Sequence, residues 1–391
     1  MQFTIVLYVV PSLETNNMKR NQFFSITIVL LLLITLPNFL GFIGAGNPSN
    51  VDYSETMGSG NFQWAFAVIT DSHVGGGIPE FDGIGWDDGA SGIDGTNGAY
   101  LREAVGWINC NHVKENIKFV IFGGDLADSG EKSELRKGKE ILDTLAIPYV
   151  PIIGNHDMWP YSGPSKKSDG EGIEAKHARG DEIWKDLFSN TFANLRYSFM
   201  NWNDGLRAVP TWNGEADKID ENGNVIEDAG CYSFFQCFSF DYGNPSWHFV
   251  FADFGTRDHA PSGYRGVHGG ADLFDSAKVQ GTWPWLKNHI AGTANNYKDD
   301  HLVIITHFPP TKLDAPWGQM SFSFSEYDTI TRWMANFQNK IGYWFAGHYH
   351  MERAYDVETY GSRTVCRGIE TGPTMGGHGC AHCIRVIRVY D

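Results

Sequence analysis

The stretch IKFVIFGGDLAD, residues 117–128, joins a short apolar run to a turn that carries two carboxylates. Residues 117–122 have the length and composition of a buried β-strand, and the two glycines that follow end it. The segment PYVPIIGNHD, residues 148–157, repeats this arrangement with Asn155, His156 and Asp157 after its glycine. In both stretches, groups that can bind metals or move protons directly follow a predicted strand.

The pattern around these two stretches predicts strands that alternate with helices. Apolar residues recur at helical spacing in 99–116 and 133–146, and residues 279–290 also favour a helix. Short apolar or alternating runs predict further strands at 62–70, 238–242, 247–253, 301–306, 342–346, 353–359, 363–369 and 384–390. Such alternation is typical of an α/β fold built from βαβ units.

Polar clusters also follow three other predicted strands. Asp71 and His73 follow the first strand, His307 follows the strand at 301–306, and His348 and His350 follow the strand at 342–346. Ligands of open α/β sheets bind beyond the carboxyl ends of the strands. We therefore expect these clusters to converge in space despite their separation in the sequence.

The residue types in these clusters indicate a metal site. Carboxylates, imidazoles and one amide suit a divalent metal with mixed nitrogen and oxygen ligands. Alternate residues of a strand point to the same side, so Asp71 with His73, and His348 with His350, can each serve one site. The glycines before Asp125, Asn155 and His348 allow tight turns and close backbone approach. The clusters contain no cysteine, which disfavours a structural zinc site, and the sequence has no G-x-S-x-G nucleophile motif.

Taken in order, the clusters resemble the five motif blocks of the calcineurin-like metallophosphoesterases, from about residue 62 to the C-terminus without residues 158–236. The resemblance implies an α/β fold, specifically a four-layer α/β/β/α sandwich of two mixed β-sheets flanked by helices. It also implies a dinuclear centre that holds two divalent or transition metal ions, most readily Fe, Zn or Mn. By position, the implied ligands are Asp71, His73, Asp125 and His350 for one ion, and Asp125, Asn155, His307 and His348 for the other.

The same resemblance implies catalytic roles for two more residues. His156 would be a proton donor or a phosphate contact, and Asp157 would orient His156. Two metals about 3.5–4 Å apart can activate a water and neutralise the charge that develops in an in-line displacement. The implied reaction is hydrolysis of a phosphomonoester or phosphodiester by attack of metal-bound hydroxide.

The residues that follow Asp125 indicate which branches of the family the sequence resembles. Asp128 stands where purple acid phosphatases have a tyrosine, and the Asp-x-Val-Asp-Arg-Gly pattern of the Ser/Thr protein phosphatases is missing. The residues 124–128, together with Asp71-x-His73, more closely resemble the motifs of the cyclic-nucleotide phosphodiesterase and sphingomyelinase-like branches. The rival hypotheses are a catalytically silent secreted metal-binding or scaffold protein of the same fold, and a nuclease.

Composition limits the class of partner. The 391 residues include 30 Lys and Arg against 46 Asp and Glu, which gives a formal net charge of −16. A protein that follows a nucleic-acid backbone needs clustered positive charge, so no nucleic-acid partner is expected. The expected partner is a small phosphoester substrate.

The first 46 residues have the layout of a secretory signal peptide. Lys19 and Arg20 precede the apolar run 26–36, and small residues follow at 44–46. The alternative is a retained membrane anchor at residues 23–43. The expected domain order is a signal or anchor (1–46), a linker (47–61) and the metallophosphoesterase domain (62–391), and the expected location is outside the cytoplasm.

Two regions remain open in function. The loop-rich insertion at 158–236 could be a lid or a surface decoration.

Export would favour disulfides, with Cys231–Cys237 and Cys380–Cys383 as the local pairs among 15 possible pairings of the six cysteines. Further residues that could contact substrate or line a pocket, although ordinary surface or core roles explain them as well, are His177, Arg179, His259, His268, Trp202, Trp212, Phe234 and Phe235.

Overall fold

The computed structural model describes most of the chain from residue 60 onward, together with one N-terminal strand. The described residues are 3–9, 60–76, 95–128, 130, 132–158, 167–168, 173–174, 180–212, 218–219, 225–227, 232–255, 271, 273, 281–311, 321–375 and 382–391. All of the predicted metal ligands lie within these ranges.

The first sheet has five strands in the order β1-β18-β2-β3-β4. Strands β2, β3 and β4 run parallel, whereas β18 runs antiparallel to β2 and β1 antiparallel to β18. The parallel strands bring the chain back to the same end of the sheet each time. The bounds are β1 (Phe3–Val9), β2 (Phe62–Ile69), β3 (Ile117–Phe122), β4 (Tyr149–Pro151) and β18 (Cys383–Tyr390).

The second sheet has seven strands in the order β16-β17-β15-β14-β13-β12-β7. Its four central strands, β17, β15, β14 and β13, are parallel, and antiparallel strands flank them on both sides. The bounds are β7 (Met200–Asn203), β12 (Phe238–Tyr242), β13 (Trp247–Phe251), β14 (Leu302–Ile305), β15 (Ile341–Ala346), β16 (Arg353–Glu358) and β17 (Thr364–Glu370).

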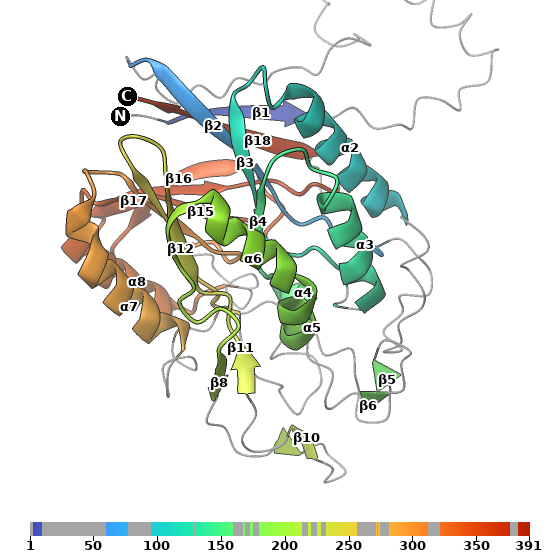
Figure 1. Ribbon diagram of the computed structural model, residues 1–391. Coiled ribbons are helices and arrows are strands. Elements are labelled where there is room, and N and C mark those ends of the chain that lie inside the picture. Colours follow the sequence, from blue (N-terminus) through green and yellow to red (C-terminus); the bar gives the residue numbers. More distant parts are fainter. Residues whose placement is uncertain are drawn as a thin grey trace, which may run out of the picture.

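Helices flank the two sheets (Figure 1). Helices α2 (Gly95–Asn111) and α3 (Lys132–Leu142) lie on the side of the first sheet, and α7 (Thr282–Thr293) and α8 (Phe324–Met334) lie on the side of the second. The predicted α/β class, with two mixed sheets flanked by helices, is confirmed. The predicted strands and helices also form, with ends that differ by a few residues.

Aromatic side chains fill the space between the two sheets. The ring of Phe66 in β2 stacks on Phe119 of β3 with a centroid distance of 5.4 Å. The same ring meets Phe249 of β13 and Phe345 of β15 edge-on, at 5.5 and 5.7 Å. Aromatic pairs in these geometries add about 0.5–1.5 kcal/mol each beyond area burial. This packing fixes the sheets face to face and so sets the distance between the loops at their ends.

Part of the predicted insertion belongs to the core. Helices α5 (Gly180–Leu187) and α6 (Ser189–Ser198) bury Trp184 and Phe192, and Phe188 between them is buried as well. Strand β7 pairs with β12 at the edge of the second sheet. The sequence showed little periodicity here because both helices are short. Short pairs of strands make up the other described elements of this region: β5 (Lys167–Ser168) with β6 (Ile173–Glu174), β8 (Pro210–Trp212) with β11 (Tyr232–Phe234), and β9 (Lys218–Ile219) with β10 (Val225–Glu227).

Strand β1 lies inside the segment predicted to be a signal peptide or anchor. It pairs antiparallel with β18 along seven residues, from Phe3 opposite Val389 to Val9 opposite Cys383. The sequence analysis predicted no strand there. The apolar run 23–43 is outside the described residues. None of the helices in the described ranges is long and apolar enough to cross a membrane.

Candidate metal centre

The site forms where the parallel strands of both sheets end. Backbone hydrogen bonds join the loops: the Asp71 N–H donates to Gly124 O (2.9 Å), and the Gly347 N–H donates to His307 O (3.0 Å). The Thr374 N–H donates to the carbonyl of Thr70 (2.8 Å), which ties the loop after β17 to the loop after β2. These bonds hold loops from both sheets around one point.

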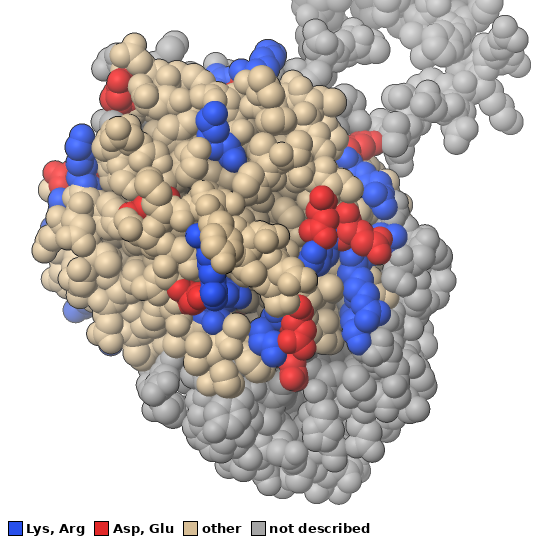
Figure 2. Space-filling view, in the orientation of Figure 1, with Lys and Arg blue, Asp and Glu red and all other residues tan. Residues whose placement is uncertain are grey.

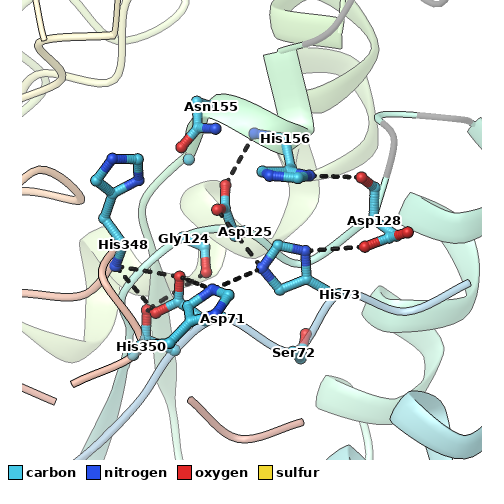
Figure 3. A network of polar contacts seen from close by, with 12 residues as sticks. Asp71, Ser72, His73, Gly124, Asp125, Asp128, Asn155, His156, His348 and His350 are labelled. Atoms are coloured by element: carbon cyan, nitrogen blue, oxygen red, sulfur yellow. Dashed lines mark hydrogen bonds and ion pairs between the residues drawn. The ribbon is translucent and has the colours of Figure 1, made fainter. Parts of the chain in front are cut away.

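Three overlapping groups of side chains face one another at this point (Figure 3). Within each group, the possible ligand atoms lie within 4.8 Å of one another. Asp125 belongs to two of the groups, and so does His73. The groups are Asp71, His73 and His350; His73, Asp125 and His156; and Asp125, His307 and His348.

Asp71, His73 and His350 form one side of the site. The Nε2 atoms of His73 and His350 are 3.1 Å apart, and His350 Nε2 is 3.4 Å from Asp71 Oδ1. His73 Nε2 is also 3.7 Å from Asp125 Oδ2. Two imidazole nitrogens and two carboxylates thus converge, which is the donor set predicted for the first ion.

The other side of the site is built around His307. Its Nε2 lies 3.1 Å from Asp125 Oδ2 and 3.0 Å from Asn155 Oδ1, and its Nδ1 is 2.9 Å from the carbonyl of Gly123. The imidazole of His348 stands beside that of His307, with ring centroids 5.1 Å apart. Asp125 is the carboxylate common to the two sides.

The predicted ligands themselves adopt an unusual backbone conformation. The φ angles of Asp71, His73, Asp125, His348 and His350 lie between 42° and 76°, in the left-handed region. Such a conformation costs on the order of 1–3 kcal/mol at each residue that is not glycine. Alternation along a strand, which the sequence suggested, is therefore not what aims the side chains: β2 ends at Ile69 and β15 at Ala346, and left-handed turns aim them instead.

Two glycines are required by close packing, as the sequence predicted. Gly124 has φ of 103°, and a Cβ there would lie 2.5 Å from His307 Nδ1. A Cβ at Gly154 would lie 2.1 Å from Asp125 Oδ1. Any side chain at either position would push a predicted ligand out of place.

Charge at the centre of the site is concentrated on Asp125, which is 1% exposed. Burial would raise the pKa of Asp125, but the neighbouring imidazoles, first His307 and then His156 and His73, hold the pKa well below its usual range. Burial would lower the pKa of His307, but Asp125 raises it to about 9. The buried carboxylate thus requires a positive neighbour, a requirement that a divalent cation also meets. The donor set fits such an ion.

Asp71 is likewise stabilised as a carboxylate. Burial acts to raise its pKa, but the hydrogen bond with His350 and the charge of that ring lower the pKa below its ordinary value. Thr70 Oγ1 donates to Asp71 Oδ2 (2.8 Å), and the His348 N–H lies 3.1 Å from both carboxylate oxygens. These donors fix the orientation of the carboxylate.

Asp128 has a role in the site that was not predicted from the sequence. Its carboxylate accepts from Nδ1 of His73 (3.0 Å), and its backbone carbonyl accepts from Nδ1 of His156 (2.6 Å). A proton on Nδ1 of His73 leaves the lone pair of its Nε2 for a metal ion, and the contact at Nδ1 of His156 directs the Nε2 of that ring toward the site (Figure 3). The signal was visible as a second carboxylate three residues after Asp125, but from the sequence it served only to compare branches of the family and not to assign a partner for a histidine.

The role predicted for Asp157 is wrong in detail. Its carboxylate accepts from the backbone N–H groups of Leu126, Ala127 and Gly154, each at 2.9 Å, and not from the ring of His156. Burial, followed by the charge of Asp125, raises the pKa of Asp157 to about 7. Because these three N–H groups belong to two different loops, the Asp157 carboxylate holds the two loops together. Asp128 positions His156 instead.

Ion pairs fix the loop that carries His348 and His350. Glu352 forms an ion pair with Arg385 of β18, and it also accepts from the Gly372 N–H (2.8 Å). Arg353 Nε lies 2.6 Å from Glu370 Oε2 in β17. Arg385 donates in addition to the Glu370 carbonyl (2.8 Å), so this buried arginine links the two sheets beside the site.

The other residues that the sequence singled out lie either outside the described residues or away from the metal centre, in or against the core. His177, Arg179, His259 and His268 lie outside the described residues, as do Cys231 and Cys380 of the predicted disulfides and the side chain of Trp212. Trp202 stacks on the core rings of Phe238 and Phe240, so it packs in the core. Phe235 is buried and Phe234 half-buried.

Comparison with known families decides the affiliation. The family model of the calcineurin-like phosphoesterases matches residues 65–352. The chain belongs to this family. The predicted site residues from Asp71 to His350 all lie inside the matched range, as does the segment 158–236 that the sequence analysis set apart. A comparison with curated proteins finds no match.

Solved structures of related type are only distantly similar. A dimetal phosphatase from Danio rerio is 12% identical, with 85% of this chain and 94% of that chain covered and a TM-score of 0.43. The calcineurin-like phosphoesterase YfkN from Bacillus subtilis is 12% identical (84% and 90% covered, TM-score 0.35). A purple acid phosphatase from yellow lupin seeds is 14% identical (78% and 43% covered, TM-score 0.39).

Family membership and the donor groups together support metal-dependent hydrolysis of a phosphoester. The carboxylates and imidazoles of this family member are buried or half-buried and face one another at one point. Such a site can bind divalent ions and hold an anionic ester near them.

Proposed function

We propose that this member of the family hydrolyses phosphomonoesters or phosphodiesters at a dinuclear centre of two Fe, Zn or Mn ions. The observation that carries the proposal is the position of Asp125. Its Oδ2 is 3.7 Å from His73 Nε2 on one side and 3.1 Å from His307 Nε2 on the other. One carboxylate can therefore serve both ions, with Asp71, His73 and His350 on one side and Asn155, His307 and His348 on the other.

Residues of the chain hold the His156 ring in place and so determine where it can transfer a proton. The ions, when bound, would polarise the phosphoryl group and lower the pKa of water. His156 is held at Nδ1 by the Asp128 carbonyl, so its Nε2, when the ring is protonated at both nitrogens, is oriented to donate to the leaving-group oxygen or a phosphate oxygen. Its backbone N–H donates to Asp125 Oδ1 (2.9 Å), which couples the position of the ring to the central carboxylate.

Direct attack of water on phosphorus agrees with the side chains around the site. Ser72, the hydroxyl residue within the first motif, donates its Oγ–H to the Leu126 carbonyl (3.0 Å) and is buried. It is therefore not presented as a nucleophile. We expect oxygen from isotopically labelled water to enter the product phosphate in a single turnover. A covalent phosphoenzyme trapped by acid quenching would contradict this mechanism.

An activity assay on two kinds of ester tests the substrate class. Metal-loaded full-length chain would be assayed on matched aryl phosphomonoester and phosphodiester substrates, with His156→Ala in parallel. A preference for diesters would support the phosphodiesterase-like interpretation of the 124–128 motif, and a preference for monoesters would favour a phosphatase. Inactivity of the fully loaded chain on a broad ester panel would favour the silent metal-binding protein.

Surface charge supports a small substrate rather than a nucleic acid. On the face shown in Figure 2, the Lys and Arg side chains of the described residues form small groups, several of them beside Asp and Glu. Ion pairs between neighbouring residues include Lys139 with Asp143 and Lys185 with Asp186. Nucleic-acid binding would call for a continuous basic track.

We also propose export, on the basis of the charged start, apolar run and small residues in 1–46. Cleavage after residue 46 would remove β1 and leave β18 as the edge of the first sheet. N-terminal sequencing of the protein isolated from the cells that make it and from their surroundings tests this. We expect an extracytoplasmic protein that begins near residue 47; a cytoplasmic protein that retains residues 1–46 would contradict export.

A further inference from the structure

A second cluster of histidines lies far from the metal centre, between the second sheet and helix α7. His248 is the second residue of β13, so it lies at the opposite end of that strand from the site. His289 comes from α7, Asp241 from the neighbouring strand β12, and Tyr297 from the turn after the helix. Asp241 and His248 are each 2% exposed, whereas His289 is half-buried and reachable from solvent.

A carboxylate fixes the tautomer of His248. Asp241 Oδ1 lies 2.6 Å from His248 Nδ1, so Nδ1 carries the proton and Nε2 the lone pair. Asp241 is itself held by the Tyr297 hydroxyl (2.9 Å) and by Nδ2 of Asn201 (2.6 Å). A carboxylate that orients a histidine in this way is the usual partner of a metal-binding imidazole.

The second imidazole faces the first. His289 Nε2 is 2.9 Å from His248 Nε2. Aromatic rings lock both imidazoles: Tyr297 stacks on His248 (centroids 4.5 Å apart, planes at 16°), and Trp285 stacks on His289 (5.0 Å, 11°). The two Nε2 atoms face each other nearly head-on, with ring centroids 5.1 Å apart. The rings must therefore part slightly and tilt before both lone pairs can share one ion at the usual Zn–N distance of about 2.0–2.1 Å.

The same contact occurs in the metal centre. There His73 Nε2 faces His350 Nε2 at 3.1 Å, and a carboxylate, Asp128, holds Nδ1 of His73 at 3.0 Å. The pair His248 and His289 reproduces both features with Asp241 in place of Asp128. In neither pair can two lone pairs face each other without a proton or a cation between them.

We propose that His248 and His289 form a third cation site, separate from the dinuclear centre. Both Nε2 atoms coordinate a borderline divalent ion, with Zn²⁺ as the representative, and solvent oxygens complete the coordination. Asp241 does not bind the ion but keeps His248 in the required tautomer. On binding, the proton that His289 Nε2 shares with His248 moves to Nδ1 of His289, so both rings stay neutral.

Zinc stoichiometry tests the site independently of the reaction. The full chain, stripped with chelator, would be dialysed against Zn²⁺, and bound zinc per chain measured by elemental analysis. The variants are His289→Gln and, as a matched control, His112→Gln at a half-buried histidine of α2–β3. We expect the wild type and His112→Gln to bind one more zinc per chain than His289→Gln, with the far-ultraviolet circular dichroism of all three the same.

The result is read as a difference, so it does not depend on how many ions the dinuclear centre holds. Equal zinc in His289→Gln and His112→Gln would overturn the proposal and leave Asp241, His248 and His289 as a hydrogen-bond chain. Should His289→Gln fail to fold, His289→Asn is compared with His112→Asn in the same way: one zinc fewer per chain supports the site, and equal zinc overturns it. Hydrolytic activity serves as a separate readout for the proposed function.

Discussion

Replacing Asp125 with asparagine is expected to lower kcat by on the order of 10³-fold and to reduce the metal content of the purified protein. Metal polarisation of a phosphoryl group contributes several kcal/mol to the transition state, and each factor of ten in rate corresponds to about 1.4 kcal/mol. Asp125 is the carboxylate nearest to both sides of the site, so its loss should affect both ions. Steady-state kinetics and elemental analysis measure the two effects.

The control for this substitution is Asp186→Asn. Asp186 is an exposed carboxylate that pairs with Lys185 on α5, and its side chain is 69% exposed. We expect wild-type kcat and metal content from it. Asp125→Asn should remain folded, because it keeps the size of the side chain and its hydrogen bond from the His156 N–H. Full activity in folded Asp125→Asn would contradict the ligand assignment.

Replacing His156 with glutamine is expected to lower kcat by about 10²–10⁴-fold for esters with poor leaving groups, which is the usual contribution of a proton-transfer group. The loss should be much smaller for an aryl ester with an acidic leaving group, because that oxygen departs without a proton. Turnover of an alkyl and a nitrophenyl ester of the same phosphate measures the difference. Metal content should stay at the wild-type value.

Asp128→Asn separates the role of His156 from that of the metal ligands. The substitution keeps the backbone carbonyl that holds His156 but alters the side chain that holds His73. We expect metal affinity to fall about 10–100-fold, as for other partners of ligating histidines, with unchanged dependence on the leaving group at saturating metal. If His156→Gln instead lost metal, His156 would be a ligand rather than a proton-transfer group.

Sequence patterns predicted a secondary-structure element correctly where a local run of residues is enough to specify it. The apolar runs 117–122 and 62–70 predicted β3 and β2 because a buried parallel strand needs a continuous apolar segment. The segment 180–198 was harder to predict, since α5 and α6 are short and their burial depends on contacts with distant residues. Strand β1 was missed because a seven-residue apolar strand and part of a leader have the same composition.

The order and chemistry of the polar clusters determined the family and the residues that meet at the site. Local sequence can do this because each cluster follows a strand, and parallel strands end at the same edge of a sheet. Only the tertiary structure determined which contacts and which role each of these residues has. The left-handed turns at the ligands, the turning of Asp157 toward three amides and the double role of Asp128 all depend on contacts between loops of different strands. The pairing of His248 with His289 does too, since a strand and a helix 41 residues apart must pack before the two rings can meet.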